Sequence, residues 1–578
     1  MQLRVLLDGK SLRHSISTDG LSQARALTIF SPGSRRPNTR EQGDMSTRLL
    51  WVAAVFLAFV TQSAAAWRPA QQQEHPRLKN GTTTFWPSLR FHFMVKRSPM
   101  KVHGLSAFAM LASPVVSEDG SPNVLYDTFA TFTEDSTVYN YTLVDGIAYA
   151  SRSSPGGGNS PAAIECANSD SLPSINSIAA ALSEASGVSS ISASGRDIEC
   201  PNGDWFKVSV NGIDFGLCYS GSSGFSMHGS DMDINVEYVD NILVPALDVQ
   251  CEKVATCHSA TAIGKSLLTG EAFSSENRRR MLKAALDFSL DISPSCSCKS
   301  TPRPCIFIHG QGIKTEMPDN QNSFPTRYWG NMTDHASCCT SVKFAVLNTV
   351  NHSWTEDAQQ QKVCERALAV SETSVNSRIS DTIIVTHSMG ALMLGGAIAT
   401  GKCSLAPSTT WVSTGAPMRG SMGSDYLQGL CDGGTNVIVE KVANITGRCP
   451  VSAAIQSLAY ENEHYASSKL KVAYEAAQQV YRTHVKAAMC SYKNSGLISS
   501  YQWQFWLLGK VVPHKSPHND GMVEFYSCAG GIPESKFGNN YRDEFYVTKL
   551  NHFDVAFQGG DALLDEAKMP VKWFECLL

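Results

Sequence analysis

The stretch 382–400, T-I-I-V-T-H-S-M-G-A-L-M-L-G-G-A-I-A-T, constrains the fold more than any other part of the chain. A β-branched run meets Ser388, and small and apolar residues then follow without a break. This pattern predicts a strand, a sharp turn and a helix, and so tight a turn strains the backbone of its central residue. The strain would lift the Ser388 side chain clear of the sheet, beside the first amides of the helix. Ser388 is then a candidate nucleophile, and the plain alternative is a helix N-cap serine.

A nucleophilic serine needs a histidine as general base and a carboxylate that orients this histidine. Asp520 lies in H-N-D-G-M-V, just before a glycine turn, and His552 lies in L-N-H-F-D, after an expected strand at 546–548. The order serine, aspartate, histidine is the one expected for such a sheet. We predict Ser388 as nucleophile, His552 as general base and later general acid, and Asp520 as the orienting carboxylate. A plain turn aspartate and an ordinary loop histidine are the alternatives.

From Pro304 onward the pattern alternates between strand and helix, which predicts an α/β fold with a mainly parallel sheet and helices on both faces. The expected strands lie at 305–308, 342–347, 383–385, 410–414, 436–442 and 546–548, and the expected helices at 357–371 and 453–491. The stretch 418–513 is longer than a connection needs, so we expect a helical cap or lid there. The cluster Trp503–Leu508 would form a lid or an acyl pocket, or would pack as an ordinary core.

Five dispersed motifs give this region a family resemblance. They are I-F-I-H-G-Q-G at 306–312, V-T-H-S-M-G at 385–390, S-T-G-A-P-M-R-G-S at 413–421, N-D-G-M-V at 519–523 and N-H-F-D at 551–554. In this order they resemble the lipase branch of the α/β-hydrolases over 304–578, notably bacterial triacylglycerol lipases. The elbow is also similar to that of deacylases of GPI-inositol. The resemblance implies an oxyanion hole formed by the backbone amides of Gln311 and Met389, and no cofactor.

The resemblance also raises questions about neighbouring residues. Thr386 stands where the family usually has glycine or alanine. Its branched side chain should crowd the turn, although a position at the end of a strand can prefer such a residue. In bacterial lipases an aspartate two residues after the histidine can help to bind calcium, which would make Asp554 a ligand. His309 is expected to be structural and His387 to pack beside the pocket. His514 and His518 could ligate a metal with Asp520, but we expect solvated loop histidines.

The N-terminal half shows no catalytic pattern. Residues 1–44 are polar and read as a non-native or disordered extension, and 45–66 reads as a signal peptide, with Arg48 before an apolar core and Ser63-Ala64-Ala65-Ala66 after it. If translation starts at Met1, a signal anchor is the alternative. We expect a disordered leader at 67–100, a cysteine-containing, β-rich α+β accessory or pro-domain at 101–292, and a linker at 293–303.

The cysteine content indicates the compartment of the protein, and the net charge limits its possible partners. The chain has 17 cysteines without zinc-type spacing, which favours disulfides in an oxidising compartment and leaves at least one thiol over. Sequons at Asn80, Asn140, Asn331, Asn351 and Asn444 agree with secretion. The net charge of −4 gives no support to nucleic-acid binding.

These observations predict a secreted serine hydrolase that cleaves carboxylic esters, with a lipid or long-chain acyl ester as substrate and transient contact with a lipid surface. A catalytically silent protein of the same fold that binds a lipid or a host surface is one alternative. Acyl transfer, with an alcohol in place of water, is another, since only water access to the acyl-enzyme differs.

Overall fold

The computed structural model describes residues 86–578 apart from short gaps at 117–120, 154–162, 168–172, 194–195, 202, 246–250, 276–287, 291–295, 433–448 and 500. The chain divides into two units, 1–66 and 67–578, and everything below concerns the second. The predicted extension, the predicted signal peptide, the leader as far as 85 and the expected strand at 436–442 lie outside the described residues. No helix among the described residues is long and apolar enough to cross a membrane.

The N-terminal region (86–290) is built on one twelve-stranded sheet whose neighbouring strands are all antiparallel, in the order β6-β5-β4-β3-β2-β1-β13-β12-β11-β10-β7, with β14 beside β3. Its strands are β1 (Ser88–Val95), β2 (Ala107–Val116), β3 (Asn123–Glu134), β4 (Thr137–Val144), β5 (Ile147–Ser153), β6 (Ala163–Cys166), β7 (Ser186–Val188), β10 (Asp204–Val210), β11 (Ile213–Tyr219), β12 (Phe225–Gly229), β13 (Met232–Val239) and β14 (His258–Ser259). Helices α2 (Ile175–Leu182) and α3 (Ala262–Thr269) share its core, and β8 (Ile191–Ala193), β9 (Arg196–Asp197) and β15 (Phe288–Leu290) form a small second sheet.

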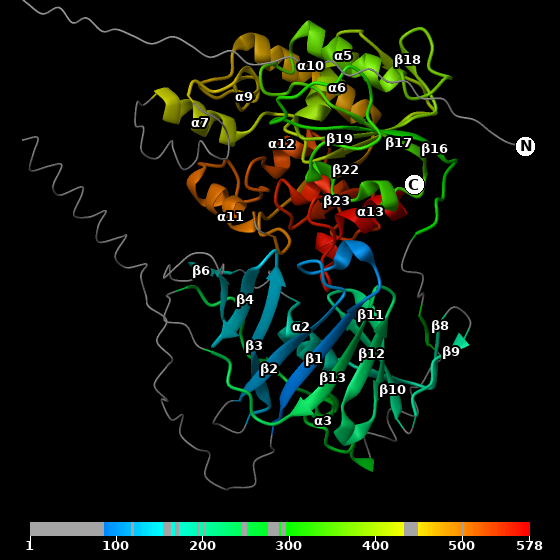
Figure 1. Cartoon of the computed structure of the whole chain (residues 1–578), viewed down its shortest axis with the longest axis vertical. Helices are drawn as coiled ribbons and strands as arrows, with labels where there is room; N and C mark the ends of the chain where they lie inside the picture. Colours follow the sequence, from blue (N-terminus) through cyan, green and yellow to red (C-terminus); the bar gives the residue numbers. More distant parts are fainter. Residues whose placement is uncertain are drawn as a thin grey trace, which may run out of the picture. The chain divides into compact units, whose positions relative to one another are not determined.

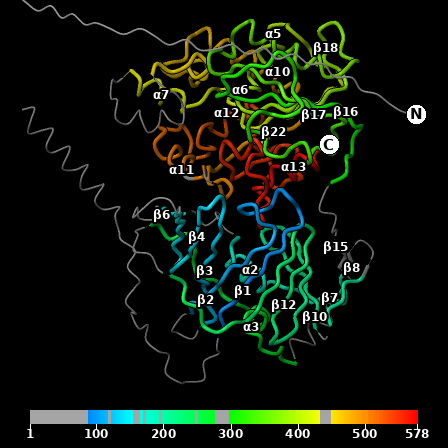
Figure 2. The backbone as a smooth tube through the Cα atoms, viewed as in Figure 1, coloured from blue at the N-terminus to red at the C-terminus, as the bar shows by residue number. Residues whose placement is uncertain are grey.

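The prediction of a disordered leader up to Met100 is wrong for the part that the structure describes. β1 lies inside the large sheet, paired with β2 on one side and β13 on the other (Figure 1), and Figure 2 shows its backbone beside that of β2. Its sequence alternates, so that Leu89, Phe91 and Phe93 are fully buried while Arg90 is exposed. Strict alternation is the mark of a half-buried strand, and here it outweighs the basic composition of the segment.

The C-terminal region (296–578) contains the predicted parallel sheet. All six strands are parallel, in the order β17-β16-β19-β21-β22-β23. They are β16 (Arg303–Ile308), β17 (Cys339–Ala345), β19 (Ile383–His387), β21 (Thr410–Thr414), β22 (Val485–Ser491) and β23 (Phe545–Thr548). Alternate residues face opposite sides: Ile306 and Ile308 share a core with α5 (Asp357–Leu368), α6 (Met389–Ala399) and α10 (Ser468–His484), whereas Phe307 shares one with α13 (Pro570–Leu577). Helices therefore cover both faces (Figure 1).

The predicted helical cap at 418–513 is only partly correct. Residues 485–491, expected to continue a long helix, form β22 in the interior of the sheet, between β21 and β23. The helix α10 packs against α6 and is part of the core rather than a cap. Ala487 and Ala488 are fully buried in β22. Alanine is the strongest helix former, so burial between two strands overrides the local preference here.

Shorter elements complete the described chain. The helices α7 (Met422–Asp432), α9 (Ala453–Gln456), α11 (Gln502–Val511) and α12 (Phe525–Ala529) lie outside the strand–helix alternation. A two-stranded pair joins β18 (Arg378–Ile379) to β20 (Ser404–Leu405). Single 3-10 turns occur at Ser98–Met100, Gly221–Ser223, Arg327–Trp329, Met332–His335, Glu534–Lys536, Asp554–Ala556 and Glu566–Lys568.

Eight disulfides connect sixteen of the cysteines, and Cys257 is free and exposed. The pairs are Cys166–Cys251, Cys200–Cys218, Cys296–Cys576, Cys298–Cys338, Cys305–Cys339, Cys364–Cys403, Cys431–Cys449 and Cys490–Cys528. Two of them hold the segment predicted as a linker, because Cys296 and Cys298 are both tied to the C-terminal region. Disulfides in this number agree with an oxidising compartment.

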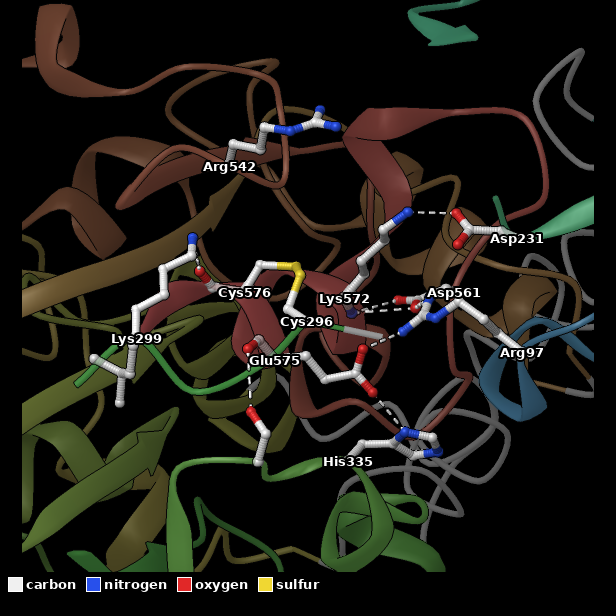
Figure 3. Close-up of a disulfide and its surroundings, with 12 residues drawn as sticks. Arg97, Asp231, Cys296, Lys299, His335, Arg542, Asp561, Lys572, Glu575 and Cys576 are labelled. Atoms are coloured by element: carbon white, nitrogen blue, oxygen red, sulfur yellow. Dashed lines mark hydrogen bonds and ion pairs between the residues drawn. A yellow bond between two sulfur atoms is a disulfide. The ribbon is translucent and has the colours of Figure 1, made fainter. Parts of the chain in front are cut away.

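Buried charges join the N-terminal region to α13 (Figure 3). Arg97 donates to Asp561 at 2.7 Å and to Glu575 at 2.5 Å, and all three side chains are almost completely buried. Glu575 also lies 2.6 Å from His335, and Lys572 pairs with Asp231 of the N-terminal sheet. A buried ion lacking its partner is strongly unfavourable, so these pairs hold the two regions together.

Candidate active site

Ser388 occupies the predicted sharp turn between β19 and α6. Its backbone has φ 53° and ψ −129°, a conformation that a non-glycine residue rarely adopts. The amide of Ser388 donates to the carbonyl oxygen of Thr414 at 3.0 Å, which ties the turn to the neighbouring strand β21. Gly390 allows α6 to start against β16, because a Cβ atom there would lie 2.5 Å from the carbonyl oxygen of Ile308.

Thr386 does not crowd this turn, contrary to our expectation. It is fully buried at the end of β19, where a branched side chain fits the pleat. Its hydroxyl accepts a hydrogen bond from the indole N–H of Trp411 at 2.8 Å. The hydroxyl therefore has a buried partner of its own, one strand away from the turn.

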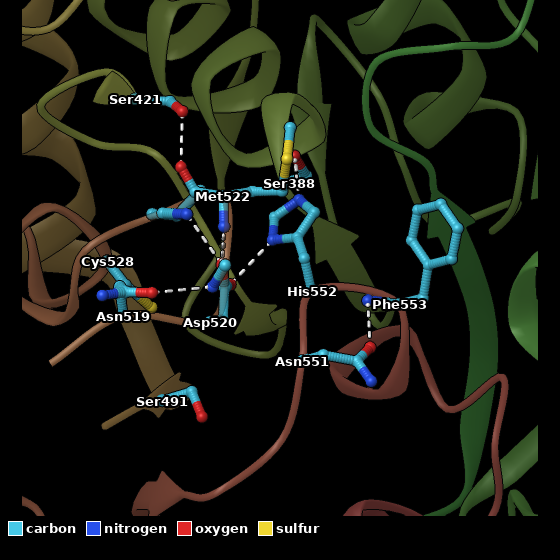
Figure 4. A network of polar contacts seen from close by, with 12 residues as sticks. Ser388, Ser421, Ser491, Asn519, Asp520, Met522, Cys528, Asn551, His552 and Phe553 are labelled. Carbon is cyan, nitrogen blue, oxygen red and sulfur yellow. Dashed lines mark hydrogen bonds and ion pairs between the residues drawn. The ribbon is translucent and has the colours of Figure 1, made fainter. Parts of the chain in front are cut away.

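The three residues that were selected from separate motifs meet in the structure (Figure 4). Nε2 of His552 lies 2.9 Å from Oγ of Ser388, and Nδ1 of His552 lies 2.7 Å from Oδ2 of Asp520. The residues are 7%, 5% and 2% exposed, for His552, Ser388 and Asp520 respectively. A carboxylate can only accept, so Nδ1 carries the proton of the neutral imidazole and Nε2 is free to accept the serine hydroxyl.

The N-D-G-M-V sequence explains how Asp520 is aimed. Oδ1 of Asp520 accepts the amides of Met522 at 2.9 Å and Val523 at 2.7 Å, which leaves Oδ2 for His552. The side chain of Asn519 accepts the amide of Gly521 at 3.0 Å, and Gly521 supplies the positive φ of 92° that the turn requires. Sequence reasoning missed the role of Asn519, although its place before Asp-Gly was a signal of such a turn.

The N-H-F-D sequence positions His552 in a similar way. Oδ1 of the buried Asn551 accepts the amides of Phe553 and Asp554, both at 3.0 Å. The amide of His552 donates to the carbonyl oxygen of Asp520 at 3.0 Å, so the two loops are also joined through their backbones. Asn551 was missed as well, and again an asparagine directly before the functional residue was the signal.

The surroundings of Asp554 do not fit a calcium ion. Its carboxylate accepts the amide of Leu497 at 2.7 Å, the side-chain amide of Asn551 at 2.6 Å and the hydroxyl of Tyr501 at 2.9 Å. A cation needs oxygen atoms that are not already facing N–H and O–H donors. Asp554 therefore fastens the loop of His552, and no cluster of three or more acidic, histidine or cysteine side chains suited to a metal occurs among the described residues.

The loop that follows β16 lies directly against Ser388. A Cβ atom on Gly310 would be 2.5 Å from Cβ of Ser388. His309 is fully buried and structural, as predicted: its Nδ1 donates to the carbonyl oxygen of Gly310 at 2.8 Å and its Nε2 accepts the amide of Leu347 at 3.0 Å. Burial lowers the pKa of His309 to about 4, so its ring is neutral. Gln311, the next residue along this loop, and Met389, the first residue of α6, are the two whose amides we predicted as oxyanion donors.

The expectation of solvated histidines at 514 and 518 is wrong for the first of them. The side chain of His514 is buried and its Nδ1 lies 2.7 Å from the carboxylate of Glu524, which is itself buried. The ring of His518 stacks on that of Tyr492, with 4.1 Å between centroids. The backbones of Glu524 and Asn519 form a β-bridge across the turn that carries Asp520, so the His514–Glu524 pair is attached directly to this turn.

The helix α11 lies against both loops of the site. A Cβ atom on Gly521 would be 3.0 Å from the carbonyl oxygen of Phe505, and the rings of Phe505 and Phe553 are 4.7 Å apart. Phe505 is buried, so part of the predicted aromatic cluster does pack as core. On the same helix Trp506 remains 39% exposed, and Phe553, next to His552, is 36% exposed. The loop of His552 and the helix packed against it therefore both present exposed apolar side chains.

A cavity of about 690 Å³ lies elsewhere in the molecule. It is lined by residues of both regions, among them Tyr141, Leu497 and Leu564. Ser388, Asp520 and His552 do not line it.

Gly390→Ala is expected to lower kcat/KM for an ester substrate by about 100-fold. The added Cβ would push α6 away from the backbone of Ile308 and carry Ser388 with it, and a displacement of about 1 Å costs a factor of this size. Gly395→Ala in the same helix is the matched control, because its Cβ would meet no atom closer than 3.4 Å. Initial rates with a p-nitrophenyl ester measure the effect, and equal rates for both variants would contradict it.

No protein-family model matches this chain, and no curated protein matches it by sequence. Solved structures match part of it. They include a lipase from Staphylococcus hyicus (12% identity over 48% of this chain and 95% of that chain, TM-score 0.26), the metagenomic carboxyl esterase MGS0156 (13%, 49% and 75%, TM-score 0.27) and phospholipase PlaB from Legionella pneumophila (11%, 40% and 46%, TM-score 0.25). This chain thus spans less than half of the Legionella chain. Likeness at such distance concerns the fold alone and says nothing of the reaction.

Proposed function

We propose that the protein is a serine hydrolase that cleaves carboxylic esters. The single observation that supports this most is the pair of hydrogen bonds that joins Ser388 to His552 and His552 to Asp520, on a strained turn between a parallel strand and a helix. A serine on a strained turn, bonded to an oriented histidine, has the arrangement of an activated nucleophile. Structural serines rarely combine all these features.

In the proposed reaction, Oγ of Ser388 attacks the acyl carbonyl carbon while Nε2 of His552 takes the hydroxyl proton. Asp520 stabilises the imidazolium that forms. The amides of Gln311 and Met389 donate to the oxyanion, and a donor of this kind typically contributes about 100-fold or more in rate. The alcohol leaves with the proton from His552. Water then attacks the acyl carbon while His552 takes its proton. The bond between the acyl carbon and Oγ of Ser388 breaks, His552 returns the proton to Oγ, and the acid leaves.

The proposed substrate is a lipid or another long-chain acyl ester. The exposed rings of Phe553, which follows His552 in the chain, and of Trp506, on the helix packed against that loop, support this, because they offer apolar surface on the elements around the base. The same surface would touch a lipid aggregate transiently, and no nucleic acid is expected as a partner. The eight disulfides support a secreted protein.

Labelling with a fluorophosphonate probe tests the proposed activity. The native full-length protein is expected to react and Ser388→Ala to remain unlabelled, because the probe needs an activated serine. A folded native protein that does not react would point to the silent binding protein instead. Hydrolysis of p-nitrophenyl esters from acetate to palmitate then tests the substrate class, and a preference for acetate would contradict a long acyl chain. Addition of an alcohol acceptor distinguishes acyl transfer from hydrolysis.

A further inference from the structure

Three hydrogen bonds connect the loop after β16 to the loop of His552, behind Ser388. The amide of Gly310 donates to Oη of Tyr328 at 2.7 Å. Oη of Tyr328 lies 2.5 Å from Nδ1 of His387, and Nε2 of His387 lies 3.0 Å from the carbonyl oxygen of His552. The path does not use the side chains of Ser388, His552 or Asp520.

The chemistry of each group gives this path one direction. A carbonyl oxygen only accepts, so Nε2 of His387 must carry the ring proton. A neutral imidazole has one N–H, so its Nδ1 must accept, and the hydroxyl of Tyr328 donates to it. The hydroxyl oxygen of Tyr328 also accepts the hydrogen bond from the amide of Gly310. The three hydrogen bonds thus all point the same way, from the amide of Gly310 through Tyr328 and His387 to the carbonyl oxygen of His552.

The path also depends on His387 remaining neutral. Burial, and after it the neighbouring His552, hold the pKa of His387 well below its usual range. The two rings are only 4.8 Å apart, between centroids. A neutral His387 can therefore donate to the backbone of His552 without placing a second positive charge beside the imidazolium that forms in the reaction.

We propose that Tyr328 and His387 are positioning residues, which hold the oxyanion loop and the loop of the base in one fixed relation around Ser388. This proposal depends on the proposed function. Neither residue touches the reacting atoms by the geometry described, so neither is catalytic. Ser388 needs the base on one side and the oxyanion donors on the other at the same moment, and each sits on a separate loop. The three hydrogen bonds can form together only when both loops are in place. They therefore link the position of the base to the position of the oxyanion donors.

Tyr328→Phe removes a single hydroxyl and with it two of the three hydrogen bonds, those to Gly310 and His387. We expect kcat to fall about 30-fold with KM changed by less than about threefold, because a loosened site loses transition-state contacts and keeps its substrate contacts. Tyr126→Phe is the matched control. Tyr126 is fully buried in β3 and its hydroxyl has no hydrogen-bond partner among the described residues, so both kinetic constants should stay unchanged.

Two variants of His387 separate the hydrogen bond from simple packing. His387→Gln keeps an N–H where Nε2 donates to His552, and His387→Leu keeps the bulk without any donor. We expect the glutamine variant to retain kcat within about tenfold of native and the leucine variant to lose about 100-fold. Equal losses in both would assign His387 a packing role and overturn the proposal.

Hydrogen exchange measured by mass spectrometry tests the coupling without any activity. In Tyr328→Phe the segments 306–313 and 549–557 should both exchange faster than in the native protein, although Tyr328 bonds to only one of them. Faster exchange in 306–313 alone would overturn the coupling, as would a native kcat in an active enzyme. If the native protein is neither labelled nor active, the proposed function fails, while the exchange data still decide whether the loops are coupled.

Discussion

If the proposed function holds, replacing His552 with alanine is expected to lower kcat by about 10⁴- to 10⁶-fold, the range that loss of the base costs in serine hydrolases. In the structure His552 is the group that links Oγ of Ser388 to the carboxylate of Asp520. Without it the serine proton has no acceptor, and the leaving alcohol has no donor. Single-turnover and steady-state rates with the best p-nitrophenyl ester give the measurement.

Two further variants show whether the fall of kcat in His552→Ala comes from loss of the base. His464→Ala removes an exposed histidine far from the site in sequence and should leave kcat unchanged. The double variant of Ser388→Ala and His552→Ala should be no slower than either single one, because residues that act as a unit lose their effect together. Losses that multiply would mean that the two side chains act independently, and a His552→Ala enzyme with native kcat would disprove the assignment of the base.

Arg97→Met is expected to lower the free energy of unfolding by about 3–5 kcal/mol, the cost of breaking a buried ion pair. The guanidinium contacts Asp561 and Glu575 while the side chains of all three are almost completely buried. Methionine would leave the buried carboxylates of Asp561 and Glu575 without the positive charge of Arg97. Chemical denaturation monitored by tryptophan fluorescence measures the change.

Arg90→Met provides the matched control for this prediction. Arg90 also pairs with a glutamate, Glu237, at 3.7 Å, but both side chains are about half exposed. An exposed pair contributes at most about 1 kcal/mol, so this variant should unfold almost as the native protein does. If both variants lost the same free energy, the buried charges would not be what joins the N-terminal region to α13. A much larger loss of unfolding free energy in Arg97→Met than in Arg90→Met would argue against a pro-domain that is simply removed. Removal of that domain would leave Asp561 without the positive charge of Arg97.

The C-terminal region was predictable where local pattern and tertiary structure agree. β21 has the predicted bounds, and the turn at Ser388 is where the β-branched run and the small residues indicated. The predicted partners Asp520 and His552 meet this serine because parallel strands bring the loops after them to one edge of the sheet. Order along the chain is enough to find such residues when the topology is regular.

β22 could not be predicted, because its conformation depends on neighbours far along the chain. It contains alanines that favour a helix, and only its place between two strands makes it extended. β1 was missed for another reason. Its alternation was a local sign of a strand, and the basic composition of the segment concealed it, whereas its partner β13 lies more than a hundred residues later.

The strained turn and the choice of Ser388, Asp520 and His552 could be read from the chain alone, since they depend on local backbone preference and on the chemistry of single residues. How these side chains are held could be seen only in the folded molecule. There Asp554 accepts a hydrogen bond from Tyr501, Tyr328 is joined to His387, and Arg97 is buried against α13. The physical reason is that hydrogen bonds and ion pairs between distant segments exist only after the chain has folded.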